Sequence, residues 1–306
     1  MTTVSTSTSA FYTRSTMDMA ELRARAEALQ SDLSRGQRIA RSSDDPVGAS
    51  RLRQLQRSDA LATIDTTNAS LASTDLQLTD TALGAFADYV TRVQELTTQA
   101  ANGTLTDVQR AGIGSEIAAI RENVIQLANG RNAAGNALFG GQAAGAAYTV
   151  DAAGNAVYGG TATAGDLPLG DGQSVTRGLT GPEFLNFSVN GTPTDLMAAL
   201  KSLADALQAG GGGAQAAAQT GLAALDQGLD AITTAQTVVG TRLAWIDLTT
   251  ERRIDLSEMR ANEENEVGGT DIAVTVARLQ ETMTVLQASQ ASFTRLSSLS
   301  LFQLLN

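Results

Sequence analysis

The sequence predicts a mainly α fold: an elongated antiparallel helical bundle or coiled-coil rod formed by both termini, with a small β-rich insert. Three observations predict it. Both ends of the chain carry apolar residues at heptad spacing, and such a seam has to pack against another helix. Long helical patterns lie between the two ends. The heptads are lost only in the middle of the chain, where three of the four prolines and several glycine pairs fall.

The composition narrows the class of function. Acidic residues outnumber basic ones by 32 to 21, for a net charge of -11. This balance argues against a nucleic-acid groove and against docking on anionic lipid, both of which need a basic face. Cysteine and histidine are absent, which removes a member from most catalytic and metal-binding designs. We therefore expect a structural protein with no enzymatic activity, no cofactor and no metal site.

The N-terminal segment, residues 1–40, is expected to be an assembly segment. Residues 1 to about 16 are rich in Ser and Thr, and we expect them to be partly disordered in an isolated subunit. A helix is predicted from Met17 to about Ser34, with Gly36 as its C-terminal glycine. The residues that we assign to its assembly face are Leu22, Leu29 and Leu33.

A structural turn follows this helix. Asp45 suits a helix N-cap, and Pro46 suits the first helical position, where its missing N–H is not needed. Asp44 adds negative charge at the positive end of the helix dipole. Arg38 and Arg41 are natural ion partners across the turn. The alternative interpretation of the two aspartates is a catalytic or metal-binding pair.

Helices are predicted from Pro46 to about Ala101 and from about Thr106 to Asn129, within an N-terminal helical segment at 41–135. The insert, 136–193, is expected to be β-rich. Residues 148–150 and 156–158 flank a five-residue loop typical of a hairpin, and further strands are expected at 174–176 and 187–189.

The C-terminal helical segment, 194–262, is predicted to form a helix from Thr194, a break at Gly210–Gly213 and a long helix from Ala214 to Asn262. The assembly segment 263–306 opens on an acidic patch of three glutamates (Glu263, Glu264 and Glu266), which we interpret as a solvated turn, with a divalent-ion site as the alternative. Thr270 or Asp271 is expected to cap the last helix. Its predicted assembly face consists of Ile272, Val276, Leu279, Met283, Leu286 and Phe293.

Several stretches resemble the bacterial flagellin superfamily. The turn contains Ser43-Asp44-Asp45-Pro46, which is similar to the motif usual in the hook–filament junction branch. The other matching stretches are Arg92–Thr104, Glu116–Asn129, Leu138–Gly141 and Thr270–Phe302. Within the insert, the short motifs Tyr158–Gly160, Gly170–Val175 and Leu179–Gly181 resemble the small β domain of junction proteins.

The resemblance implies a structural subunit of the bacterial flagellum. Such a subunit leaves the cell by type III export without a cleavable signal peptide, remains extracellular and joins hook to filament by self-assembly of its terminal helices. The implied partners are other copies of the chain, a hook-side junction protein, flagellin and an export chaperone, with no nucleic acid and no membrane insertion. The alternatives are flagellin itself, as a bulk or minor filament subunit, and a coiled-coil surface adhesin.

Overall fold

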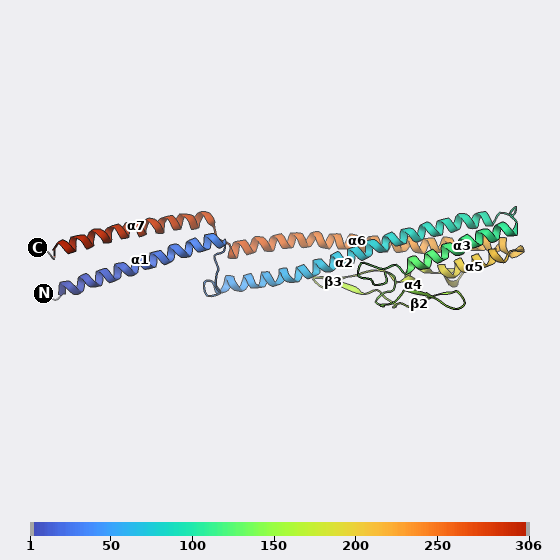
Figure 1. The fold of residues 1–306 in the computed structure, drawn as a ribbon, viewed down its shortest axis with the longest axis horizontal. Helices are drawn as coiled ribbons and strands as arrows, with labels where there is room; N and C mark the ends of the chain where they lie inside the picture. The colour runs from blue at the N-terminus through green and yellow to red at the C-terminus, as the bar shows by residue number, and fades with distance from the viewer. Residues whose placement is uncertain (1–2, 304–306) are drawn as a thin grey trace. The chain divides into compact units, whose positions relative to one another are not determined.

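The computed structural model describes residues 3–303, and its fold is mainly α, as predicted (Figure 1). The helices are α1 (Thr3–Arg35), α2 (Pro46–Ala100), α3 (Asp107–Ala128), α4 (Gly181–Leu185), α5 (Leu196–Ala209), α6 (Gly212–Gly268) and α7 (Ile272–Gln303). The strands are β1 (Tyr148–Val150), β2 (Ala156–Tyr158), β3 (Asp166–Gly170), β4 (Gln173–Thr176), β5 (Asn186–Val189) and β6 (Thr192–Asp195).

The chain divides into two compact units, and each is described by itself. The first combines the described residues up to Asp59 with those from Asp255 onward. It therefore holds α1, α7, the first turns of α2 and the last turns of α6. The second unit, Ala60–Ile254, holds the remainder of α2 and α6 together with α3, α5 and all six strands.

In the second unit, the apolar faces of four helices form one core. Helices α3 and α5 pack so closely at Gly114 that a Cβ there would lie 2.9 Å from the carbonyl oxygen of Ala204. Polar contacts join α2 to α6: the Gln94 amide donates to Asp226 at 2.7 Å, and the Gln215 amide donates to the Ala101 carbonyl at 3.1 Å. One apolar face of α2 is buried in this core through Leu83, Phe86, Val90, Val93 and Leu96.

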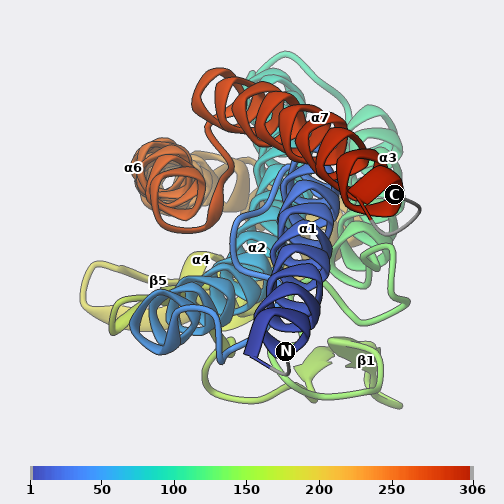
Figure 2. The ribbon, with the colours of Figure 1, turned by 90° about the vertical axis from the view of Figure 1, so that its left-hand side faces the viewer.

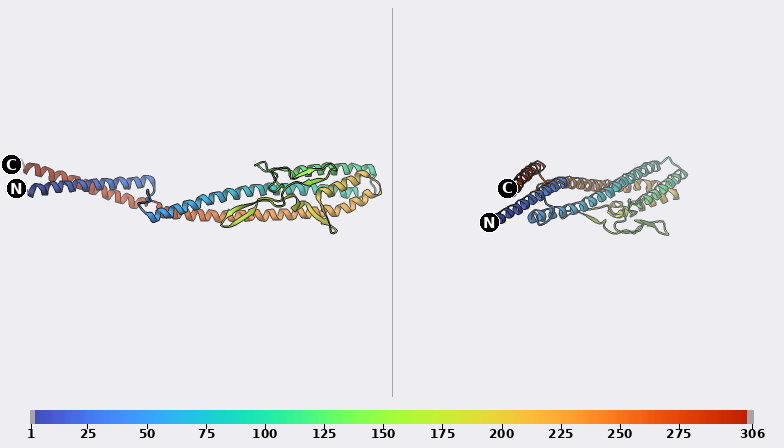
Figure 3. Two further views of the ribbon diagram at one scale, coloured as in Figure 1. Left: turned by 90° about the horizontal axis from the view of Figure 1, so that it is seen from below. Right: turned by 60° about the vertical axis from the view of Figure 1, so that its left-hand side comes forward.

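The strands form three separate antiparallel hairpins, β1–β2, β3–β4 and β5–β6. The predicted hairpin with a five-residue loop is confirmed, with Tyr148 opposite Tyr158. Phe139, in the loop before β1, and Phe184, on α4, stack on Phe86 of α2. The three ring centroids are 4.9–5.7 Å apart. The hairpins lie beside the long helices of the second unit (Figure 3), and the aromatic cluster packs the segments next to β1 and β5 against α2.

Three predicted boundaries are wrong. Helix α1 begins at Thr3 rather than at Met17. Upstream of Met17, the Thr16 hydroxyl donates to the Tyr12 carbonyl at 3.0 Å, and the Tyr12 ring packs on Phe293.

The second correction concerns the first residue of α5, and the third concerns the last residue of α6. Helix α5 begins at Leu196 rather than at Thr194, because residues 192–195 pair with β5 and Asp195 caps the helix through the Ala198 N–H. Helix α6 continues to Gly268, so Glu263, Glu264 and Glu266 are helical and do not form a turn. Strands β3 and β6 were not predicted, and each contains a proline.

We predict that Phe184→Ala destabilises the chain by about 3–5 kcal/mol, since it removes a fully buried ring from the aromatic cluster. Urea unfolding followed by far-ultraviolet circular dichroism measures the change. Val150→Ala, on a residue of the same set of hairpins that is 49% exposed, is the matched control and leaves the midpoint nearly unchanged. Equal midpoints for both variants would show that the cluster does not hold the hairpins.

Candidate assembly site

Helices α1 and α7 lie side by side in the first unit (Figure 2). The ring of Tyr12 meets that of Phe293 edge to face at 5.4 Å, and beyond the other end of α1 Gln37 pairs with Gly269. The two helices therefore run antiparallel. This pairing brings the two predicted terminal seams, which lie at opposite ends of the sequence, against each other.

Most of the predicted seam residues lie between the two helices. Leu286 is buried, with 8% of its surface exposed, and Ala26 is buried on the facing helix. The half-buried members are Leu22, Leu29, Leu33, Val276, Leu279 and Phe293.

Two predicted members do not lie in the seam between α1 and α7. Ile272 is 66% exposed and Met283 is 43% exposed. Thr282 is buried where the heptad pattern placed Met283, and its hydroxyl bonds the Arg278 carbonyl at 2.7 Å. At 3.6 residues per turn, the side chains of these two neighbours point about 100° apart around the helix. The burial of Thr282 therefore leaves Met283 at the edge of the interface.

The α1–α7 pair leaves open grooves along its length. One cavity, of about 460 Å³, is lined by Leu22, Arg25, Leu29, Arg278, Glu281, Thr282 and Val285. A second, of about 190 Å³, lies near Phe11, Met19 and Phe293. Phe11, Val285 and Leu296 are exposed beside them. Two helices alone therefore do not cover the apolar surface that they present.

The predicted turn has the expected cap. The Asp45 carboxylate accepts the Gly48 N–H at 2.9 Å, and Pro46 is the first residue of α2. A Cβ at position 48 would lie 2.7 Å from both the Asp45 carboxylate and the Ile39 side chain, so a larger residue there would displace the ends of these two side chains. Arg38 pairs with Asp45 at 3.1 Å, as expected for one of the two arginines.

Arg41 was predicted to be an ion partner across the turn, but its contact with Asp44 is made by its backbone N–H. The Asp44 carboxylate accepts the backbone N–H of Arg41 at 2.7 Å and that of Ala40 at 3.2 Å. Asp44 thus closes the turn through the backbone. The two aspartates bind different groups, so they do not form a pair that shares one site.

One acidic residue at the end of α6, Glu263, also has a structural partner. Both Glu263 oxygens accept hydrogen bonds from the Arg51 guanidinium, one of them at 2.8 Å, and this ion pair lowers the pKa of Glu263. Within residues 3–303, no group of three or more potential ligands gathers in metal-binding geometry. The pair between Arg51 and Glu263 was missed by the sequence analysis, since 212 positions separate its partners.

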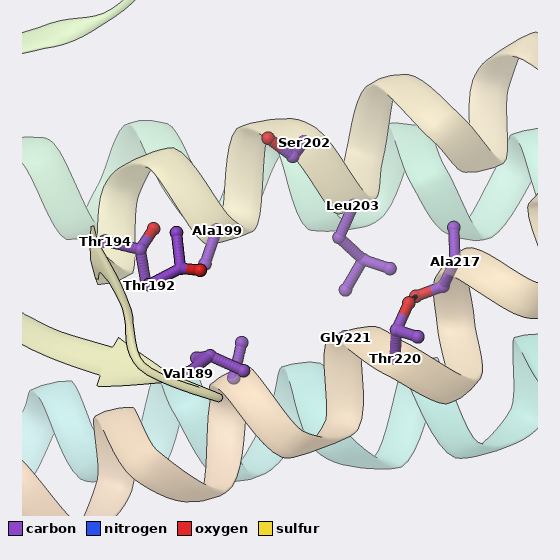
Figure 4. Close-up of a pocket in the computed structure, with 10 residues that line it drawn as sticks. Val189, Thr192, Thr194, Ala199, Ser202, Leu203, Ala217, Thr220 and Gly221 are labelled. Carbon is purple, nitrogen blue, oxygen red and sulfur yellow. Dashed lines mark hydrogen bonds between the residues drawn. The ribbon is translucent and has the colours of Figure 1, made fainter.

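Another open groove lies in the second unit, between the β5–β6 hairpin, α5 and the start of α6 (Figure 4). It measures about 280 Å³, and its lining is mostly Ala, Gly, Ser and Thr with no charged side chain. Elsewhere in this unit, the buried guanidinium of Arg121 donates to the carbonyls of Met197 at 3.0 Å and Gly154 at 2.6 Å. These contacts attach α3 to the start of α5 and to the β1–β2 loop. Separately, none of the described helices combines the length and apolarity needed to cross a membrane.

We predict a pH dependence at Asp45. Its hydrogen bonds to Gly48 and Arg38 lower the pKa of the carboxyl below its ordinary value of 3.8. The resulting stabilisation is present above pH 3.8 and is lost as the pH falls through the lower folded-state pKa. Asp45→Asn keeps an N-cap oxygen but removes the charge. The variant should be less stable than the wild type at pH 6 and equally stable near pH 2. A difference that persists unchanged at pH 2 would contradict this account; urea titrations at both pH values measure it.

Comparisons with known proteins agree with this architecture. Residues 4–144 match the family model of the bacterial flagellin N-terminal helical region. The chain is 26% identical over 288 residues to flagellar hook-associated protein 3 of Escherichia coli K12, a match that covers 89% of this chain and 90% of that protein.

Two solved structures have a similar fold. One is a flagellar hook-associated protein of Vibrio parahaemolyticus, with a TM-score of 0.67 and 21% identity, covering 74% of this chain and 100% of the other. The second is the flagellar junction protein FlgL of Legionella pneumophila, with a TM-score of 0.59 and 14% identity, covering 71% and 99%. The chain thus resembles bacterial flagellin in its N-terminal part and flagellar hook-associated protein 3 over most of its length.

Proposed function

We propose that this chain is a structural subunit of the bacterial flagellum that joins hook to filament. The observation that carries the proposal is the incomplete covering of the α1–α7 pair, which exposes Phe11, Val285 and Leu296 beside open grooves. Neighbouring copies that cover these side chains would gain roughly 1.5–3 kcal/mol for each one fully buried. The similarity to hook-associated protein 3 supports the same role.

In this proposal each segment of the chain has a separate structural role. Residues 1–40 and 263–306 assemble with neighbours, the helical segments 41–135 and 194–262 form the body, and the insert 136–193 faces outward. The assembly face consists of Leu22, Leu29, Leu33, Ile272, Val276, Leu279, Met283, Leu286 and Phe293. Ile272 and Met283, which lie outside the α1–α7 seam, would contact a neighbouring copy directly.

The proposed partners are further copies of this chain, a hook-side junction protein and flagellin. Contacts that repeat head to tail build rings or helical tubes, which suits a joint between two tubular structures. The chain would be exported by the type III route with the help of a chaperone and would act outside the cell without catalysis. The fixed pairing of its buried charges with backbone carbonyls supports a structural role.

Deletion of the gene tests the function. Electron microscopy should show bare hooks, and filament subunits should appear in the medium, because filament cannot attach without the joint. Shortened filaments on intact hooks would instead indicate a flagellin. Unchanged flagella would contradict both roles and favour an adhesin or another surface protein.

We predict that Leu286→Asp leaves export intact but prevents assembly, since it places a charge in the α1–α7 seam. Secreted protein is measured in the medium, and attached protein is measured on isolated hooks. Val157→Asp, on an exposed residue of β2, is the control and should assemble normally. Normal filaments on cells that carry only Leu286→Asp would rule out the terminal seam as the assembly element.

A further inference from the structure

The connection that follows α1 and the connection that precedes α7 lie against each other at one end of the α1–α7 pair, in the first unit. Residues 36–45 link α1 to α2, and residues 269–271 link α6 to α7. The Arg38 N–H donates to the Gly268 carbonyl at 2.8 Å, and the Thr270 N–H donates to the Gly36 carbonyl at 3.1 Å. These two bonds make a short antiparallel bridge centred on Gln37 and Gly269.

The Arg38 side chain reinforces this bridge. Its Nη2 atom donates to the Val267 carbonyl at 2.8 Å and to the Asp45 carboxylate at 3.1 Å. Val267 lies in the last turn of α6, where carbonyls lack helical partners and the dipole attracts a cation. Asp45 is the N-cap of α2. One guanidinium nitrogen therefore joins the end of one helix to the start of another.

We infer that Arg38 is a positioning residue that makes the two connections order together, so that the start of α7 depends on a side chain in the loop before α2. We name the set Arg38, Asp45, Val267 and the bridge between Gln37 and Gly269 the junction clasp. This inference does not depend on the proposed function, because it concerns the folding of the single chain.

The surrounding contacts explain why the clasp acts on both connections. Gly36 lies in the left-handed region, with φ of 67°, and ends α1 so that the chain turns directly into the bridge. After the bridge, Asp271 accepts the Val274 N–H at 3.0 Å and begins α7. Only Gly269, Thr270 and Asp271 separate α6 from α7. Loss of the bridge therefore frees the cap residue of α7 as well as the last turn of α6.

Hydrogen exchange measured by mass spectrometry on the intact chain tests the clasp. In Arg38→Ala, amides of residues 263–275 should exchange about five- to tenfold faster, since one charge-assisted hydrogen bond and one exposed ion pair are lost. Arg41→Ala is the matched control, because it removes the same charge from the same turn. It should leave exchange in residues 263–275 within about twofold of the wild type.

Peptides from Ala60–Ile254 act as an internal reference for folding and should be unchanged in both variants. Faster exchange confined to residues 36–45 of Arg38→Ala would overturn the inference, and so would equal acceleration at 263–275 in both variants. Faster exchange throughout Ala60–Ile254 would also overturn it, because the effect would then be a general loss of stability.

A protease specific for glutamate gives an independent measurement. Glu264 and Glu266 lie in the last turns of α6 and are protected while the helix is intact. Cleavage after these residues should be faster in Arg38→Ala than in Arg41→Ala, as the end of α6 opens more often. Equal cleavage rates in the two variants would contradict the clasp.

Discussion

Each long helix of this chain presents an apolar face, and the structure depends on which other segments pack against that face. In the second unit these faces meet one another and the aromatic cluster of Phe86, Phe139 and Phe184, so the large apolar side chains of the core are covered. In the first unit, the described residues of α1 and α7 pack mainly against each other. A pair of helices encloses one seam and leaves its flanks open. The same constraint therefore gives a closed core in one unit and open grooves in the other.

Arginine side chains stabilise the packing where the chain is irregular. Arg121 binds the carbonyls of Met197 and Gly154, and Arg242 donates to the Gly178 carbonyl at 2.7 Å. A guanidinium has five donors in a fixed plane, so one side chain can satisfy carbonyls of several segments at once. The hairpins of the second unit thereby attach to the helices through polar contacts as well as through the aromatic rings.

The existence of the long helices and the cap at Asp45 could be predicted from the sequence, because both depend on neighbours in the chain, whereas some helix ends and the short helix α4 could not. Periodic apolar residues and the Asp45–Pro46 pair are local signals. Two features that were not predicted, the N-terminal part of α1 and the β5–β6 hairpin, also had local signals. Tyr12 and Met19 extend the spacing of the α1 seam upstream, and Asn190–Gly191 is the dipeptide typical of a two-residue hairpin, with both residues at positive φ. By contrast, the contact of Arg38 with Val267 spans 229 positions, and no local pattern predicts it.

The β1–β2 loop and the β5–β6 turn differ in their contacts with the rest of the second unit. The β1–β2 loop is fixed to the helices because the Gly154 carbonyl accepts a bond from buried Arg121. The β5–β6 turn at Asn190–Gly191 is different: a side chain added at Gly191 would meet no atom within 4 Å. Loop tips of this kind tolerate inserted sequence. A peptide epitope placed between Asn190 and Gly191 would therefore project into solvent and label each subunit without disturbing the packing that the protein needs to fold.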